Sequence, residues 1–283
     1  MIYRSNRKLL VLISATLVVT GLFLSINQSQ AQESSMQSAL RGIMSRISSL
    51  LSIGGNKELS AAEKQQQELQ TRKDTVSKIY DLTMMEQNDL LTRLADLKGL
   101  NSAQEKMRLS LTNQMTENEN SFNQIHDRLE AAKTIEEIKQ LATDLKNWRT
   151  LVYDPKVRKV AAFTFVFQEK NAIEIARQRL EKISDDLDGS KELIGENKAL
   201  AESLFEKASA HIRNAEDLHG QAKILIMVAL TNQANIANSK FTAKNVLDEI
   251  TRDMTDSKKF TEQSFRDIGE AYKVFLEIGK LLK

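Results

Sequence analysis

The stretch TIEEIKQLATDLKNWRTLVYDPKVRKVAAFTFVFQEKNAIEIARQRLEKISDDL, residues Thr134–Leu187, decides the fold class of this chain of 283 residues. It opens with a helix-start signal, because the Thr134 hydroxyl can accept a hydrogen bond from a free backbone N–H while Glu137 reaches back. Apolar residues then recur three or four apart, at Ile138, Leu141, Leu145, Trp148 and Val152. That spacing places them on one face of an α-helix.

The Asp154-Pro155 pair predicts a sharp corner between this helix and a second one that reaches Leu187. Asp is a good N-cap, and Pro is tolerated at the first helical position, where its missing N–H would have no intrahelical partner. The second helix keeps the apolar spacing in its later half, at Ile173, Ala176, Leu180, Ile183 and Leu187. We expect a structural hub packed near the corner, formed by Trp148, Tyr153, Pro155, Phe163 and Phe167.

The composition favours long helices over a sheet. The chain has one proline and ten glycines, far below the average usage of about 5% and about 7%. The predicted fold class is therefore all-α: an elongated antiparallel helical bundle with long, coiled-coil-like helices.

Charge and cysteine content exclude several classes of function. The formal charge of +2 arises in residues 1–31, which carry Arg4, Arg7 and Lys8 and no acidic residue, so the rest of the chain has a net charge of −1. Outside residues 1–31 the chain therefore has no excess of basic residues of the kind that binds nucleic acid. The absence of cysteine excludes disulfides, thiolate metal sites and a cysteine nucleophile.

Residues 1–31 have the pattern of a signal peptide. A basic start precedes the apolar run 9–26, and Ser29-Gln-Ala31 supplies the small residues of a cleavage site before Gln32. The run is long for a signal peptide and short for a membrane span, so a retained anchor, with membrane contact through residues 9–26, is the alternative. Either alternative predicts an exported body: periplasmic, at the cell surface or secreted.

Residues 32–59 are expected to form a short amphipathic helix and a glycine-rich linker, with the helix packed on the body or, alternatively, docked on a membrane or partner. Residues 60–283 form the helical body, divided into N-terminal helices 60–187 and C-terminal helices 188–283. The helices expected outside the central stretch are 60–98, 102–132 with a capping box at Ser102 and Glu105, 196–219, 222–237, 243–256 and 258–283. The helix over 196–219 carries Leu200, Leu204, Ala208, Ala215 and Leu218.

No pattern of reactive residues indicates a catalytic, cofactor or metal site. His211 and His219 are eight apart and lack the spacing of four typical of helical metal ligands, so surface histidines are favoured over a zinc site. The run Val160–Phe167 is too short to span a bilayer, which favours a buried segment over membrane insertion. The sequence therefore predicts neither an enzyme nor a bound cofactor.

The segment Ile135–Ile183, with its Trp-Arg and Tyr-Asp-Pro-Lys-Val elements, and the ending AYKVFLEIGKLLK at Ala271–Lys283 resemble uncharacterised exported all-helical proteins of candidate-phyla bacteria. The resemblance implies export and an extended helical form. It implies no functional residue, because that group has no assigned function.

These patterns together predict a non-enzymatic exported protein of the cell envelope, structural or protein-interacting, that acts through long helical surfaces. A protein partner or self-association is expected. The alternatives are a membrane-active helical protein that exposes Val160–Phe167, the extracytoplasmic domain of an anchored sensor, and, with least weight, an enzyme.

Overall fold

The structure is a computed structural model that describes residues 41–46, 48–50, 52–53, 59–190, 194–237 and 244–282. Helices account for almost all of these residues, and no strand occurs among them. The helices are α3 (Ala61–Asp96), α4 (Ser102–Thr116), α5 (Glu119–Ala131), α6 (Ile135–Trp148), η1 (Arg149–Tyr153), α7 (Asp154–Gly189), α8 (Gly195–Ala237) and α9 (Lys244–Leu281). The predicted fold class, an all-α bundle with long helices, is confirmed. The signal segment 1–31, Gly54–Asn56 of the predicted glycine-rich linker, and residues 238–242 between the helices predicted over 222–237 and 243–256 lie outside the described residues.

The described residues divide into two compact units. Unit 1 contains the described residues up to Asp96 together with Glu105–Arg158, and unit 2 contains Leu97–Gln104 and the described residues from Lys159 onward. One boundary between the two units therefore falls between Arg158 and Lys159, inside α7. The sequence predicted the boundary between N-terminal and C-terminal helices at residue 188 instead.

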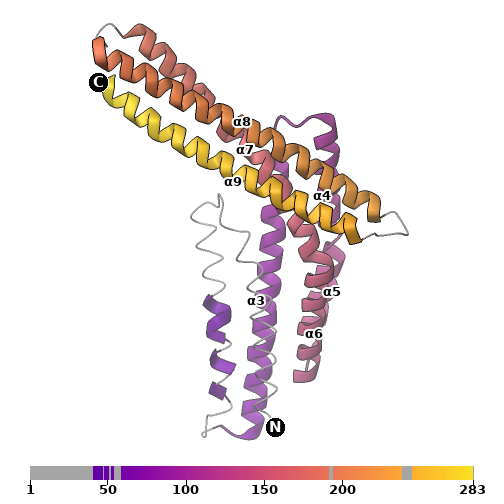
Figure 1. Ribbon diagram of the computed structural model, residues 1–283. Helices are drawn as coiled ribbons and strands as arrows, with labels where there is room; N and C mark the ends of the chain where they lie inside the picture. The colour runs from indigo at the N-terminus through magenta and orange to yellow at the C-terminus, as the bar shows by residue number, and fades with distance from the viewer. Residues whose placement is uncertain are drawn as a thin grey trace. The chain divides into compact units, whose positions relative to one another are not determined.

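Unit 1 is built around α3, with α5 and α6 packed along it (Figure 1). Its apolar core contains Val76, Ile125, Leu129, Ile138, Leu141 and Leu145. The last three belong to the predicted stripe on α6, and they are buried as expected. The short helical pieces between residues 41 and 53 also belong here: Ile43 is buried, and Arg46 donates to the Asp74 carboxylate on α3 at 2.6 Å.

The helix expected over 102–132 is two helices, because the chain turns at Glu117 and Asn118. The capping box predicted for its start lies one residue earlier. The Asn101 side chain accepts from the Gln104 N–H, and the Gln104 side chain accepts from the Asn101 N–H, both at 2.9 Å. Glu105 instead binds Arg108. At α6, by contrast, the predicted capping box of Thr134 and Glu137 is present.

The sharp corner predicted at Asp154-Pro155 is wrong. The backbone stays helical without a break from Ile135 to Gly189, through α6, η1 and α7. Proline tolerates this position because its ring fits the first turn of α7, and the preceding turn is not a pure α-helix. That turn, η1, is a π-helix.

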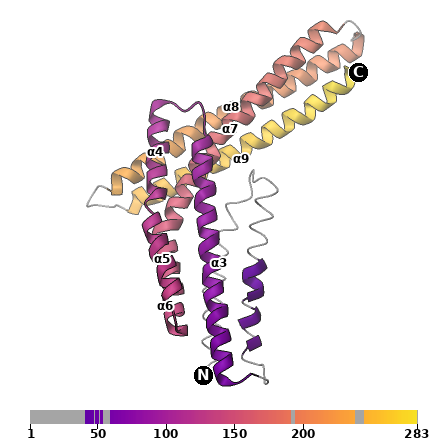
Figure 2. The ribbon, with the colours of Figure 1, turned by 180° about the vertical axis from the view of Figure 1, so that it is seen from behind.

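Unit 2 contains the later part of α7 with α8 and α9, which run side by side in both views (Figures 1 and 2). Its core includes Ile173, Ala176 and Ile183 from α7, part of the predicted stripe. The breaks expected near Gly220 and Ser257 are wrong, because α8 and α9 each run as one helix through these positions. Gly220 has a helical neighbour on either side, and Ser257 donates to the Met254 carbonyl at 2.9 Å.

The contact between α8 and α9 rests on small side chains. Alanine recurs every seventh residue of α8, at Ala201, Ala208, Ala215, Ala222 and Ala229, and each is fully buried. On α9, Ser257, Thr261 and Ser264 are also fully buried, and the Ser264 hydroxyl donates across to the Ala215 carbonyl at 2.9 Å. Leu200, predicted on the apolar face, is 49% exposed. The buried positions are instead the alanine column that begins one residue later, at Ala201. The small methyl side chains of this column let the α8 and α9 backbones approach closely.

Candidate functional site

The most unusual element of unit 1 is the π-helix η1, a single widened turn of the kind often found at functional sites. The Asp154 N–H donates to the Arg149 carbonyl, five residues earlier rather than four. The extra residue shifts the helical register. Val152, predicted on the buried stripe, is therefore 42% exposed, and Arg149 and Tyr153 point into the core instead.

Arg149 is buried among polar partners from α3 and α7. Its guanidinium donates to the Thr83 hydroxyl at 2.7 Å, to the Glu86 carboxylate at 3.1 Å and to the Asp154 carboxylate at 3.2 Å. Only 4% of Arg149 is exposed. A buried guanidinium needs such partners, because an uncompensated charge in the interior is strongly destabilising.

Tyr153 closes the other side of this cluster. Its hydroxyl donates to the Thr83 carbonyl at 3.1 Å, and the Arg149 guanidinium carbon lies 5.3 Å from the centre of its ring. The ring stacks on Trp148 with centroids 5.2 Å apart and meets the Phe122 ring edge-on at 5.9 Å. We call Thr83, Glu86, Arg149, Tyr153 and Asp154 the arginine cluster.

Burial dominates the electrostatics of the arginine cluster. It raises the pKa of Glu86 above the ordinary 4.5, and the nearby Arg149 charge opposes that rise. Burial also raises the pKa of Tyr153, with the Glu86 charge acting in the same direction, so the phenol is neutral. One guanidinium thus faces two acidic groups in a low-dielectric interior, and the raised pKa of Glu86 links its protonation to folding.

The arginine cluster can hold α3 and α6–α7 in one register, but its geometry offers no access for a substrate. Tyr153 is fully buried, and Glu86 and Asp154 are less than one-tenth exposed. The polar atoms of Arg149 are directed at protein acceptors. A buried charge pair of this kind is best attested as a device that specifies register.

The sequence named only part of this arrangement. Trp148 and Tyr153 of the predicted hub lie in unit 1 and stack on each other, with Pro155 half-buried in the next turn. Phe163 and Phe167 lie in unit 2, where their ring centroids are 4.5 Å apart. The sequence reasoning missed Arg149 and Glu86. The available signal was a charged residue, Glu86, on the apolar seam of α3.

The histidines do not form a shared site. His219 Nδ1 lies 3.1 Å from the fully buried Glu169 carboxylate on α7, whereas His211 Nδ1 lies 3.0 Å from Asp267 on α9. Glu169 Oε1 and His219 Nε2 are buried and have no hydrogen-bond partner. Within the described ranges, no group of three or more Asp, Glu or His side chains is placed to hold a metal ion.

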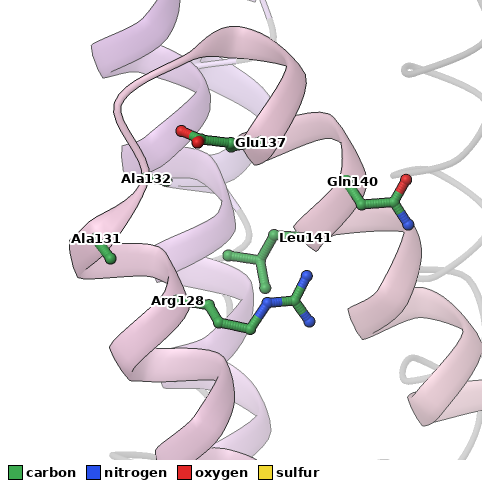
Figure 3. A pocket seen from close by; sticks show the side chains of 6 residues that line it. All are labelled: Arg128, Ala131, Ala132, Glu137, Gln140 and Leu141. Atoms are coloured by element: carbon green, nitrogen blue, oxygen red, sulfur yellow. The ribbon is translucent and has the colours of Figure 1, made fainter.

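A shallow pocket of about 260 Å³ lies at the turn between α5 and α6 (Figure 3). It is lined by Arg128, Ala131, Ala132, Glu137, Gln140 and Leu141. In Figure 3 the Arg128 and Leu141 side chains approach each other below the turn. Arg128 also binds Asp144 at 2.6 Å, and the Glu137 carboxylate caps α6, so both charges already have protein partners.

Two further findings bear on function. None of the helices in the described part of the chain combines the length and apolar character that a bilayer span requires. Comparisons of the chain with protein-family models, with curated proteins and with solved structures found no match.

Proposed function

We propose that the chain is a non-enzymatic exported protein of the cell envelope, structural or protein-interacting, that acts through long helical surfaces. The observation that carries this proposal is the contrast between its interior and its surface. The charged side chains with the most unusual surroundings, those of the arginine cluster, are buried and bonded to one another. Exposed apolar side chains, by contrast, lie along the long helices α7, α8 and α9.

The length of the helices suits a surface role. At 1.5 Å per residue, a helix of 43 residues such as α8 extends about 65 Å. Such a helix presents many turns to a partner, and partners that bind helices read positions three, four and seven apart. The signal-like segment 1–31 supports export.

The membrane-active alternative requires the apolar run Val160–Phe167 to be exposed on lipid. Val160, Phe163 and Val166 of the apolar run are buried in the folded chain. The anchored sensor differs from our proposal only in whether the N-terminal segment is kept.

The test is to express the full chain with its own N-terminus in a bacterium and to fractionate the cells. We expect the protein in the exported fraction with a mature N-terminus at Gln32, and light scattering together with small-angle scattering then gives its mass and shape. Full-length protein in the cytosol overturns export. A catalytic turnover that is lost on Glu86→Gln, with the fold retained, overturns the non-enzymatic part.

A further inference from the structure

One face of unit 2 exposes apolar side chains that the fold itself does not use. Ile175 on α7 is 57% exposed, and Tyr272 and Leu276 on α9 are 38% and 70% exposed. These residues lie beside the core, because Ala172 and Phe265 in the same region are packed against the buried cluster.

Helical geometry places the three residues on the same side of the unit. On α9, Ser264 faces α8 through its bond to Ala215, and Phe265 faces α7 through its stacking on Phe165 at 5.8 Å. At 100° per residue, Tyr272 and Leu276 point within about 20° of the Phe265 direction. On α7, Ile175 points about 80° away from the Phe165 direction and about 120° away from Glu169, which faces α8. We call Ile175, Tyr272 and Leu276 the apolar face.

Two glycines of α9 leave space beside the apolar face. Gly269 lies in the helix interior, where glycine costs about 1 kcal/mol relative to alanine, and Gly279 lies in the last turn of α9. A Cβ atom built at either position would meet nothing within 4 Å, so the packing of this chain alone does not require glycine there. Another helix can approach the α9 backbone closely at these positions.

Basic side chains border the apolar face. On α9, Lys259, Arg266, Lys273 and Lys280 recur every seventh residue and are exposed, next to the column that holds Leu276. On α7, Arg179 and Lys182 are exposed near Ile175. The acidic residues of α9 at the matching seven-residue spacing, Asp256, Glu270 and Glu277, lie one column further from the apolar face. Two of them pair with the basic column, Asp256 with Lys259 at 3.1 Å and Glu270 with Lys273 at 2.6 Å, so the charge complementarity rests on Arg266 and Lys280 together with Arg179 and Lys182 on α7.

From this arrangement we propose that the apolar face binds an amphipathic helix of a partner protein whose apolar stripe is flanked by acidic residues. This inference rests on the proposed role in protein interaction and names the partner chemistry. A helix fits better than a lipid surface, because only three large apolar side chains are involved and the glycines admit a narrow backbone. The basic column selects an acidic partner, since complementary charges at the rim of an interface set specificity.

The experiment uses the full chain and a fluorescein-labelled synthetic peptide of about four heptads, with Leu and Ile at the seam and Glu at the flanking positions. A matched peptide carries Lys in place of Glu. We expect saturable binding of the acidic peptide by fluorescence anisotropy, at least about tenfold weaker binding of the basic peptide, and weaker binding at high salt.

Two substitutions locate the binding site. Leu276→Glu is expected to weaken binding of the acidic peptide by at least about tenfold. Ile224→Glu makes the same change at a position of similar exposure, 66% against 70%, on the side of α8 that faces away from the alanine column, and is expected to leave binding unchanged. Far-UV circular dichroism checks that both variants keep their helical content.

Several outcomes overturn the proposal. Equal binding of both peptides, or equal loss in both variants, removes the role of this face. Binding to vesicles of anionic phospholipid that depends on Leu276, with no peptide binding, assigns the face to a membrane surface. Dimerisation that is lost in Leu276→Glu assigns it to a second copy of the chain. None of these outcomes bears on export, which the fractionation experiment tests separately.

Discussion

The two units of this chain specify the packing of their helices in different ways. Unit 1 uses large groups: a guanidinium with three polar partners, enclosed by Tyr153, Trp148 and Phe122. Unit 2 uses small ones, an alanine on every second turn of α8 against serine and threonine on α9. The first arrangement fixes register by directional bonds, and the second fixes it by shape, because any larger side chain in the column would hold the helices apart.

The buried ionisable groups of the two units also differ, in how completely they are hydrogen-bonded. In unit 1 the Arg149 guanidinium binds Thr83, Glu86 and Asp154. In unit 2 the Glu169–His219 pair is as deeply buried, yet each partner keeps one polar atom without a hydrogen bond. A fully bonded buried network contributes specificity, whereas a partly bonded one carries an unrecovered desolvation penalty.

The largest effect is expected from Arg149→Ala. Glu86 and Asp154 would remain buried without their cation, which destabilises the fold by about 3–5 kcal/mol. The free energy of unfolding by urea, followed by the fluorescence of Trp148 next to the cluster, measures this. Arg213→Ala is the control, because Arg213 is exposed and its loss should change stability by less than about 0.5 kcal/mol. A loss at Arg149 no larger than at Arg213 would remove the comparison.

Overpacking of the alanine column comes next. Ala215→Leu adds a large side chain where the α8 and α9 backbones meet, so we expect a loss of about 3 kcal/mol. Ala210→Leu makes the same change at an exposed position of the same helix and should be nearly neutral. Thermal unfolding followed by circular dichroism compares the two variants. Similar melting temperatures of the two variants would show that the alanine column tolerates a larger side chain.

The Glu169–His219 pair tests the difference between the buried charges directly. His219→Leu leaves a buried carboxylate without a partner and should destabilise by about 2 kcal/mol. The double variant Glu169→Leu with His219→Leu should recover that loss or exceed wild-type stability, because apolar groups can replace an imperfect buried pair without penalty. Urea unfolding gives the order of the three proteins. A double variant weaker than His219→Leu would contradict this account.

A smaller effect is expected from the protonation of Glu86, because it changes charge without changing shape. Burial raises the folded-state pKa of Glu86 above 4.5, so the stability from its neutral form is present below that value and is lost as pH rises through the folded-state pKa. Glu86→Gln imitates the neutral form. We therefore expect the stability of the variant relative to wild type to increase from pH 4.5 to pH 7 in urea unfolding. The opposite trend would mean that the Arg149 charge outweighs burial.

The smallest effect concerns the start of α4, in the short segment that unit 2 takes from between the two parts of unit 1. Asn101→Ala removes the observed cap and should cost about 1 kcal/mol. Ser102→Ala, at the position the sequence favoured, should change the free energy of unfolding very little. Equal losses in urea unfolding would argue against the observed capping box.

The sequence predicted the helical fold class and much of the core, because the apolar period directly reflects a buried helix face, although it misplaced several helix ends. Ile138, Leu141 and Leu145 are buried as expected, and Thr134 caps α6. The prediction failed where the period changes. The π-turn adds one residue, so the stripe that pointed to Val152 passes instead to Tyr153, and the predicted corner does not exist.

The apolar period of the sequence could not predict the arginine cluster, for a different reason. Its partners Thr83 and Arg149 are 66 residues apart, and their pairing depends on how α3 packs against α6–α7. The alanine column is different, since its seven-residue recurrence is visible in the sequence. Ala208 and Ala215 stood on the predicted apolar face and are buried, but the sequence did not single out the whole column, because alanine is common in helices of every kind and stands out less than a leucine stripe.

The unbroken helix through η1 and α7 has a consequence for folding. Arg158 and Lys159, the last residue of one unit and the first of the next, are consecutive residues of a single helix. This boundary therefore contains no unstructured connector that a protease could cut, whereas the boundary at Asp96–Leu97 adjoins the non-helical residues 97–101. If either unit unfolds, the other keeps a frayed helix end whose carbonyl or N–H groups have lost their partners. The backbone hydrogen bonds of α7 thus continue from one unit into the other. A substitution that destabilises one unit should therefore lower the cooperativity with which the other unit unfolds.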